Sequence, residues 1–305
     1  MRDLAPCCIC GTSERELRFV ATTQPCPGLP SSGPYGGHYQ INVCKGCGLN
    51  YSSPIFDERD VQALYTGYSE ANVADDEIAN VRATMKGYYE LGRPFLSQRK
   101  RALDIGCDIG LLLEVMRDDG FEELHGLEPV AVARERALLR VPSAKISDAF
   151  HEDVAFEQNS FDMITLIHVV DHLVHPNAIL DRVLTDLRPG GVCVAVVHDI
   201  QSPLARLTGE RFPVFNYFHH YFFSKRTLHA LFAERGFEVL RVAPTRNCYS
   251  LSFFIERIPL MPYLWRRKLS RLMRQFGIGL ISLSLPVGNI GIVALKPRTA
   301  GSTDG

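Results

Sequence analysis

The sequence predicts a doubly wound α/β fold, in which helices cover both faces of a largely parallel sheet. Two observations support this prediction. From Arg101 onwards, short apolar segments alternate with segments of helical periodicity. The stretch FDMITLIHV at 161–169 carries a continuous apolar run, as expected of a strand that is covered on both faces. Strands that alternate with helices are joined by crossovers, so we expect their directions to be parallel.

Each predicted helix of this part has recognisable ends. Pro176 suits the first turn of one helix, which we expect to stop at Gly190 and Gly191. Ser224 is an expected N-cap, and Gly236 is expected to end the same helix. The helices are predicted at 111–119, 131–140, 176–189 and 225–235. The seven strands are predicted at 101–105, 124–128, 144–147, 161–169, 192–198, 237–244 and 289–296.

Four of the nine cysteines form two pairs with C-x2-C spacing, and each pair is followed by glycine. This spacing lets two thiolates bind one ion from a tight turn, and four thiolates close a structural zinc site. The expected ligands are Cys7, Cys10, Cys44 and Cys47. Cys8 would break the spacing and is expected to be a bystander. Because no ligand position stays open, we expect this zinc to be structural or to grip substrate. Residues 1–56 are predicted to form a zinc ribbon.

Composition and charge narrow the choice of partner and compartment. The chain has 305 residues and a formal net charge of -1, which gives no electrostatic reason to expect nucleic acid or an acidic membrane as partner. The cysteine count is odd, and the N-terminus lacks the apolar run of a signal peptide. We therefore expect a reducing compartment, the cytoplasm. No stretch reaches the ~18 apolar residues of a membrane span.

A polar segment at 57–98 with helical spacing is predicted to link the ribbon to the main domain at 99–300. A helical insertion at about 252–285 separates the last two strands of that domain. Its helix mixes Trp265, Leu269, Leu272 and Met273 with Arg266, Arg267, Lys268, Arg271 and Arg274. We expect it to cap a pocket or a homodimer interface with its charges in water. Contact with a membrane surface is the alternative.

A tight glycine turn follows the first strand of the main domain, in ALDIGCDIGLLLEVM. Gly106 and Gly110 let the backbone turn sharply and approach a ligand, and Asp104 ends the strand. Ligands of open α/β sheets bind beyond the carboxyl ends of the strands. The dinucleotide fingerprint G-x-G-x-x-G is absent, because its third glycine would fall at Leu111, so a nicotinamide oxidoreductase is disfavoured. Asp108 occupies the middle of the turn, where glycine is usual.

Acidic residues also end the next two strands. Glu128 lies where a carboxylate can accept two hydrogen bonds from a ribose diol. Asp148, followed by Ala149, lies where a carboxylate can accept from an exocyclic adenine amine. Each alone is as readily a solvated loop residue or a helix cap. Three acidic residues at the ends of three successive strands together indicate a nucleoside cofactor.

On these motifs the sequence resembles the class I S-adenosyl-L-methionine (SAM)-dependent methyltransferases. The resemblance runs from about Leu103 to Val242 and rests on LDIGCDIG, GLEP, SFDMITLIHVVDHLVHP, LRPGG and FFSKRTLHALFAERGF. It implies a Rossmann-like sheet and a similar N-terminal ribbon. It also implies that the methionine part of SAM contacts the first-strand loop, its ribose the second-strand acid and its adenine the third-strand acid. These roles fall on Asp104, Gly106 and Gly110, on Glu128, and on Asp148.

Asp108 departs from the family pattern. Related sugar C-methyltransferases carry asparagine at this position, and Asn and Asp adopt a left-handed backbone more readily than other non-glycine residues. An aspartate there would meet the positive charge of the cofactor or repel its carboxylate. We expect a working cofactor loop. The alternative is a catalytically degenerate SAM-binding module whose ribbon holds a partner.

Histidine is the side chain best suited to the remaining chemistry. Methyl transfer is an in-line displacement, and an oxygen or carbon nucleophile must lose a proton near neutral pH. His172 matches, with Asp171, the h-v-x-E-H-L pattern of the resembling family and ranks first as base. His219 matches a recurrent histidine of the expected substrate lid and ranks second; packing of the lid is the alternative for either. His168 is expected to line the cofactor pocket. The sequence therefore predicts a methyltransferase of a small molecule such as a sugar, glycan precursor or secondary metabolite, with O- and C-methylation both open.

Overall fold

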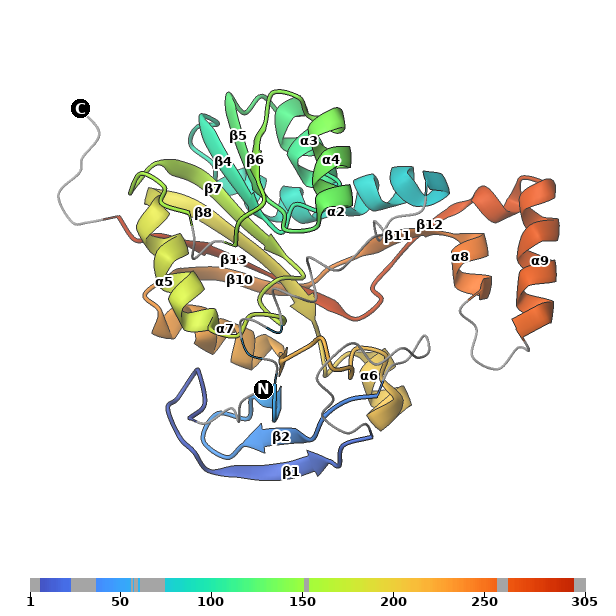
Figure 1. Cartoon of the computed structure of the whole chain (residues 1–305), viewed down its shortest axis with the longest axis horizontal. Coiled ribbons are helices and arrows are strands. Elements are labelled where there is room, and N and C mark those ends of the chain that lie inside the picture. The colour runs from blue at the N-terminus through green and yellow to red at the C-terminus, as the bar shows by residue number, and fades with distance from the viewer. Residues whose placement is uncertain are drawn as a thin grey trace.

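The computed structural model describes residues 6–22, 37–55, 57, 60, 75–150, 154–256 and 263–298. The rest of the predicted ribbon, linker and insertion lies outside the described residues. A seven-stranded sheet in the order β10-β13-β8-β7-β4-β5-β6 forms the centre (Figure 1). Its strands are β4 (Arg101–Ile105), β5 (Glu123–Leu127), β6 (Lys145–Ser147), β7 (Phe161–Ile167), β8 (Leu187–His198), β10 (Glu238–Pro244) and β13 (Asn289–Leu295). The predicted α/β fold is confirmed.

One strand runs against the expected parallel direction. Strands β6, β5, β4, β7 and β8 are mutually parallel, whereas β13 is antiparallel to both β8 and β10. The reason lies in the connection before it. The chain leaves β10 at Pro244, passes through the insertion and re-enters the sheet at Asn289, which pairs with His198 at the end of β8. In the described part of this connection, no crossover helix carries the chain back to the amino end of the strands, so β13 returns in the opposite direction.

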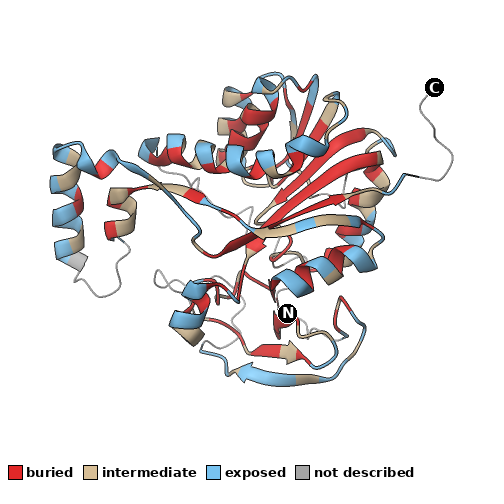
Figure 2. Ribbon diagram, turned by 180° about the vertical axis from the view of Figure 1, so that it is seen from behind, coloured by how far each residue is buried: buried red, intermediate tan, exposed pale blue. Residues whose placement is uncertain are grey.

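Helices cover both faces of the sheet (Figure 1). One face holds α2 (Ile78–Gly92), α3 (Leu111–Asp118) and α4 (Ala131–Arg140), and the other holds α5 (Pro176–Asp186) and α7 (Lys225–Glu234). Gly92 lets α2 approach the sheet closely, because a Cβ there would lie 2.5 Å from the side chain of Val194. Buried residues are concentrated in the sheet and the inner faces of these helices (Figure 2).

The predicted helix ends are partly correct. Ser224 caps α7 as expected: its side chain accepts from the Thr227 N–H, and Thr227 Oγ1 accepts from the Ser224 N–H in return. Gly236 follows the helix with a φ of 87°, a conformation that glycine adopts without strain. The helix that begins at Pro176, however, ends at Asp186, and LRPGG belongs to β8. The backbone of Leu187 is already extended and pairs with Phe161, so the strand begins before the glycines.

The N-terminal segment forms a small antiparallel sheet. It contains β1 (Arg15–Phe19), β2 (Ile41–Cys44) and β3 (Asn50–Ser52), and its fourth strand is β9 (Tyr221–Phe222), which comes from the main sheet's β8–α7 connection. Ribbon residues such as Leu49 share one hydrophobic cluster with Leu103 of the main sheet. The connection before β9 also contains α6 (Pro203–Thr208) and the short 3-10 helix η4 (Gly209–Arg211).

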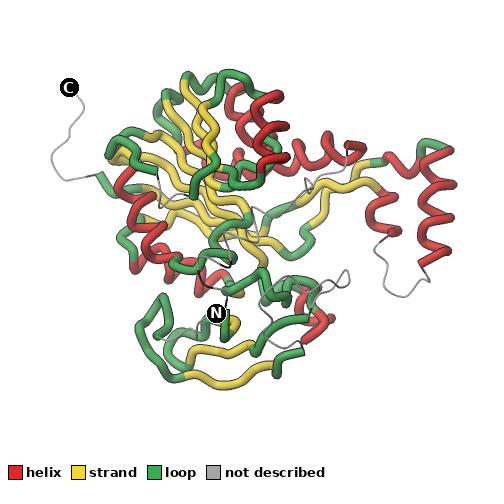
Figure 3. The backbone as a smooth tube through the Cα atoms, in the orientation of Figure 1, coloured by secondary structure: helices red, strands yellow, loops and turns green. Residues whose placement is uncertain are grey.

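The insertion forms an arm. Strands β11 (Asn247–Ser250) and β12 (Ser282–Leu285) pair as an antiparallel hairpin that carries α8 (Leu251–Glu256), α9 (Tyr263–Gln275) and the 3-10 helix η5 (Ile278–Leu280) away from the main sheet (Figure 3). Two further 3-10 turns, η1 (Asp75–Glu77) and η2 (Arg93–Phe95), flank α2. In the part of the chain that the structure describes, none of the helices has both the length and the apolar character needed to cross a bilayer.

Candidate functional site

The turn between β4 and α3 lies at the carboxyl ends of the parallel strands. Gly106 and Gly110 have φ values of 74° and 79°. A Cβ on Gly106 would lie 2.8 Å from Val169, and one on Gly110 would lie 3.0 Å from Ala137. Both positions therefore need glycine for conformation and for space. The turn is fixed to β5, because the N–H groups of Gly106 and Cys107 donate to the Leu127 carbonyl.

Asp108 adopts the left-handed conformation, with a φ of 46°. Its N–H donates to Oε2 of Glu128 at 2.9 Å, so the aspartate holds the shape that glycine gives to other such turns. Burial raises the pKa of the Asp108 carboxyl, and a hydrogen bond from the Ile109 N–H and the charge of Arg136 oppose the rise. The predicted contact of Asp108 with the cofactor stays a prediction.

Glu128 follows β5 directly and is buried. Its Oε1 accepts from the Val130 N–H at 2.8 Å, and its Oε2 accepts from the Asp108 N–H. These two bonds hold the carboxylate in a fixed plane. Burial raises the pKa of Glu128, and the two backbone hydrogen bonds partly offset that rise. Each oxygen keeps a further lone pair for an outside donor such as a ribose hydroxyl.

Asp104 lies inside β4 with its side chain almost fully buried. Thr165 Oγ1 donates to Asp104 Oδ1 at 2.6 Å. Burial raises the pKa of Asp104 to about 7, and the charges of Glu128 and Asp108 add to the rise. A buried carboxyl poised near neutral pH, beside the glycine turn, is suited to meeting a cationic ligand.

The remaining predicted cofactor residues lie on the same edge of the sheet. Asp148 and Ala149 follow β6; Asp148 is exposed. The carbonyl of Ser147, the last residue of that strand, accepts from the Glu128 N–H. Asp148 is the next residue along the chain, so its backbone lies close to Glu128. His168 follows β7, has a φ of 54°, and its buried Nδ1 has no hydrogen-bond partner among the described residues. Burial lowers the pKa of His168 to about 3, so its imidazole is neutral.

A cluster of histidines surrounds one buried carboxylate, Asp171, beside His168. The rings of His172 and His219 lie 4.3 Å apart between centroids, and those of His168 and His198 lie 4.6 Å apart. Burial acts to raise the pKa of Asp171, but His172, His198 and His219 together outweigh it and hold that pKa well below its usual value. Asp171 is therefore ionised and acts only as a hydrogen-bond acceptor.

His198 is a member of this cluster that the sequence analysis missed. It is the last residue of β8, and its Nδ1 lies 2.9 Å from Asp171 Oδ2. Since the carboxylate only accepts, Nδ1 carries the proton and Nε2 has a free lone pair. The signal in the sequence was a histidine at the carboxyl end of the fifth predicted strand, the edge where open α/β sheets bind ligands.

The two histidines that the sequence ranked as bases are held in the same tautomer. His172 Nδ1 lies 3.0 Å from the Phe218 carbonyl, which only accepts. His219 Nδ1 lies 2.9 Å from Asn216 Oδ1, and that oxygen also accepts from the Phe218 N–H. Burial lowers the pKa of both histidines. His219 Nε2 is 3.8 Å from Asp171 Oδ2, outside hydrogen-bond range. Nitrogen and oxygen atoms of this cluster also lie within 4.8 Å of one another in two trios, Asp171 with His172 and His219, and Asp171 with His168 and His198.

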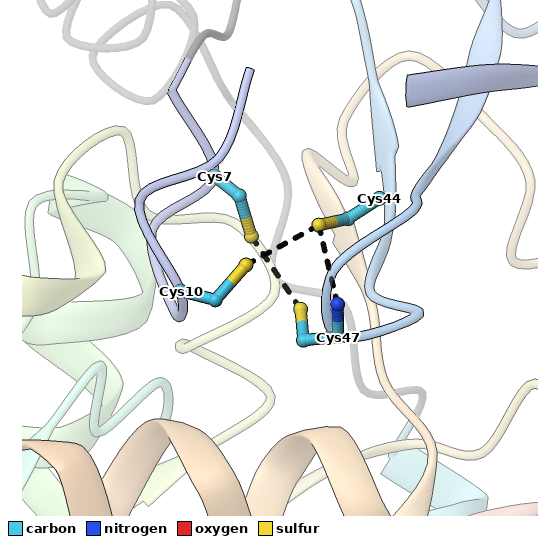
Figure 4. Close-up of side chains that lie close together, drawn as sticks. All are labelled: Cys7, Cys10, Cys44 and Cys47. Carbon is cyan, nitrogen blue, oxygen red and sulfur yellow. Dashed lines mark hydrogen bonds between the residues drawn. The ribbon is translucent and has the colours of Figure 1, made fainter. Parts of the chain in front are cut away.

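The predicted metal ligands converge. Figure 4 shows the sulfur atoms of Cys7, Cys10, Cys44 and Cys47 meeting between two loops. The Sγ atoms of Cys7 and Cys47 are 3.6 Å apart, those of Cys10 and Cys44 are 3.4 Å apart, and all four lie within 4.8 Å of one another. Tetrahedral zinc with Zn–S bonds of about 2.3 Å would separate the sulfurs by about 3.8 Å, so the donor set and its spacing fit this ion.

Comparisons with known proteins agree with the site. A family model described as a methyltransferase domain matches residues 79–242, just over half of the chain. The chain therefore belongs to the methyltransferase-domain family. Its fold is shared by a SAM-dependent methyltransferase from Leishmania major, with a TM-score of 0.51 and 17% identity over 77% of this chain and 82% of that one. A methyltransferase from Bacillus halodurans superposes with a TM-score of 0.50 and 15% identity over 71% and 100% of the two chains.

Sequence relatives include ubiquinone biosynthesis O-methyltransferases. The protein from Aeromonas salmonicida is 33% identical over 96 residues, which cover 30% of this chain and 40% of the relative. The protein from Salmonella arizonae is 25% identical over 143 residues, which cover 39% and 59% of the two chains. The matches therefore span less than two thirds of the length of these relatives.

Proposed function

We propose that this methyltransferase transfers a methyl group to an oxygen or carbon atom of a small molecule, and that the histidines around Asp171 remove the proton. The observation that carries this proposal is the hydrogen bond between His198 and Asp171 at the edge of the sheet that holds the glycine turn. A base of this kind is needed for oxygen and carbon nucleophiles, because their protons must leave as the new bond forms.

The residues at the carboxyl ends of β4, β5 and β6 fit SAM. Bound SAM supplies an electrophilic methyl group on a sulfonium. The Gly106–Gly110 turn is the proposed contact of the methionine part, because its two glycines allow close approach of the backbone. The carboxylate of Glu128, held by two N–H groups, is the proposed acceptor for ribose hydroxyls. Asp104 and Asp108 are proposed to face the positive charges of SAM. Asp148 and Ala149 are proposed to contact its adenine, and His168 is proposed to line the same pocket.

Geometry favours His198 as the proton acceptor over the two histidines that rank first in the sequence. Its Nδ1–H is bound by a carboxylate, which fixes the tautomer in which Nε2 is the proton acceptor. The His198 side chain is 26% exposed, whereas that of His219 is 10% exposed. His172 donates to a neutral carbonyl, and burial lowers its pKa. We propose His172 and His219 as walls of the substrate pocket that also orient the acceptor.

The relatives narrow the substrate. Because the named relatives are O-methyltransferases, we propose that the acceptor is a hydroxyl of a small molecule, carried either by an aromatic ring or by a sugar. The segment that carries His219 is also rich in aromatic residues, among them Tyr217, Phe218 and Phe222, and the centroid of the Phe222 ring lies 6.4 Å from that of the His219 ring. The zinc at the four cysteines is proposed to be structural, because four thiolates leave no position for substrate.

The test is a transfer experiment with isotopically labelled cofactor. Purified protein is incubated with SAM that carries a trideuterated methyl group, together with fractionated small-molecule extracts, and the products are sorted by mass. We expect one acceptor class to gain the labelled methyl group, and Asp171→Asn to abolish the gain while still binding SAM. Binding of SAM without labelling of any fraction would instead favour the catalytically degenerate binding module.

A further inference from the structure

The arm of the insertion begins at the edge of the sheet that carries the candidate site. Asn289, the first residue of β13, pairs with His198, and Pro244, the last residue of β10, pairs with Ile290. The hairpin is held on α2, because Ser250 donates to Glu77 through both its N–H and its hydroxyl. Tyr88 donates to Asn247 Oδ1 at 2.8 Å. The arm is thus a fixed extension of this edge.

Helix α9, at the end of the arm, exposes a stripe of large apolar side chains. Trp265, Leu269, Leu272 and Phe276 follow at intervals of four, three and four residues, so they share one helical face. Their exposed fractions are 67%, 37%, 49% and 69%. Ile278, Leu280 and Ile281, just beyond the helix, are also exposed. Figure 2 shows α9 at the periphery of the molecule with most of its surface open to solvent.

The opposite face of α9 is the one that packs. Ser270 is buried and donates to Glu256 Oε1 at 2.6 Å. Arg266 donates to the Glu256 carbonyl, and Arg274 pairs with Asp76 and Glu256. The sequence analysis expected this helix to cap a pocket or a homodimer interface with its charges in water, with contact with a membrane surface as the alternative. The polar face is packed instead, which leaves the apolar stripe uncovered by the described residues.

Positive charge lies beside the stripe. Lys268 and Arg271 are exposed, with Lys268 on the same side of the helix as Leu272. No acidic residue occurs in the sequence between Glu256 and Asp304, whereas that interval holds eight Lys and Arg residues. The surface of an anionic bilayer has two layers, acyl chains and phosphate headgroups. The apolar stripe, with its Trp and Phe, suits the acyl chains, and the cations beside it suit the phosphates, since no carboxylate lies on the stripe.

We propose that α9 is a membrane-docking helix that binds anionic lipid headgroups and inserts Trp265, Leu269, Leu272 and Phe276 at the acyl boundary. A second copy of the chain fits less well, since two such helices face to face would bring their cations together without compensating carboxylates. Docking at α9 would attach the protein to the bilayer surface through its arm, where amphiphilic acceptors are concentrated.

The only tryptophan of the chain lies on this stripe, so its fluorescence reports directly on docking. We would titrate the full chain with vesicles of equimolar phosphatidylglycerol and phosphatidylcholine, and with vesicles of phosphatidylcholine alone. We expect a blue shift and co-sedimentation with the anionic vesicles, and loss of both at high salt. Lys268→Gln with Arg271→Gln should weaken binding about fivefold for each cation removed, as expected from about 1 kcal/mol per basic residue.

Leu269→Ser with Leu272→Ser should abolish the shift. The control is Leu139→Ser with Leu207→Ser, which removes two leucines that are even more exposed, at 83% and 86%, from α4 and α6 and should bind like wild type. All four positions are exposed, so an unchanged melting temperature shows that the variants fold. Equal binding to neutral vesicles would overturn the headgroup assignment. A blue shift that needs no vesicles and grows with protein concentration would assign the stripe to self-association instead.

Discussion

His198 Nδ1 donates to Asp171 Oδ2 at 2.9 Å, joining the end of β8 to the turn that follows β7. The bond fixes the imidazole tautomer and turns Nε2 away from the carboxylate. His172 and His219 are fixed in the same way, through the Phe218 carbonyl and Asn216 Oδ1. Three imidazoles are thus pre-oriented around the Asp171 carboxylate before any substrate arrives.

Removing the charge of Asp171 tests this arrangement. Asp171→Asn keeps the shape of the side chain, but an amide no longer compels His198 to hold its proton on Nδ1. We expect kcat to fall by roughly 10²–10⁴-fold with little change in SAM affinity, measured by isothermal calorimetry. Asp181→Asn is the matched control. Asp181 lies on α5, is exposed and forms an ion pair with Arg235, so its substitution should leave kcat unchanged. An Asp171→Asn enzyme with wild-type kcat would rule out the proton-removal role.

The pKa of Asp104 predicts how SAM affinity depends on pH. The carboxyl titrates at about 7, so it is neutral below that pH and negative above it. SAM carries a net positive charge, and the ionised form should bind it better. Affinity should therefore rise by about tenfold between pH 6 and pH 8, following the ionised fraction. Asp104→Asn should give a flat profile. The same slope in wild type and variant would assign the dependence to another group.

Substitutions of Asp108 can separate the backbone conformation that the turn requires from the role of the aspartate's negative charge. Glycine adopts a φ of 46° without strain, so Asp108→Gly removes only the carboxylate. We expect it to bind S-adenosylhomocysteine about tenfold more weakly, the loss of one charge-assisted hydrogen bond. Asp108→Val should bind still more weakly, because a β-branched residue does not tolerate this φ. Tighter binding by the glycine variant would mean that the carboxylate repels the cofactor.

Zinc content can be measured by elemental analysis of the purified chain. We expect one equivalent of zinc in wild type, no zinc at this site in Cys44→Ala, and a lower melting temperature for that variant, since zinc binding contributes to folding. Cys8→Ala is the control and should retain the metal, because Cys8 lies outside the two pairs. A second equivalent that survives Cys44→Ala would assign a cation to the histidine trios around Asp171. Zinc-free wild type with full stability would refute the ribbon site.

The sequence analysis succeeded where the signal is local. The capping box at Ser224 and the glycine turn after β4 involve residues a few positions apart. The direction of β13 depends on the path of the insertion, which no short pattern encodes. His198 was missed because its partner Asp171 is 27 residues away, in the turn that follows β7. Periodicity showed that α9 is amphipathic, but which face packs depends on contacts with Glu256 and Asp76.

The pairing of β3 with β9 ties the ribbon to the histidine cluster. His219 and His220 immediately precede β9, and both of their carbonyls are bonded by Ser52: its hydroxyl donates to His219 and its N–H to His220. The position of His219 is therefore fixed by a hydrogen bond from a strand of the cysteine-rich segment. A chimera that borrows a ribbon from a relative must keep Asn50–Ser52 and the matching lid as one unit, because the two halves of this edge were shaped against each other.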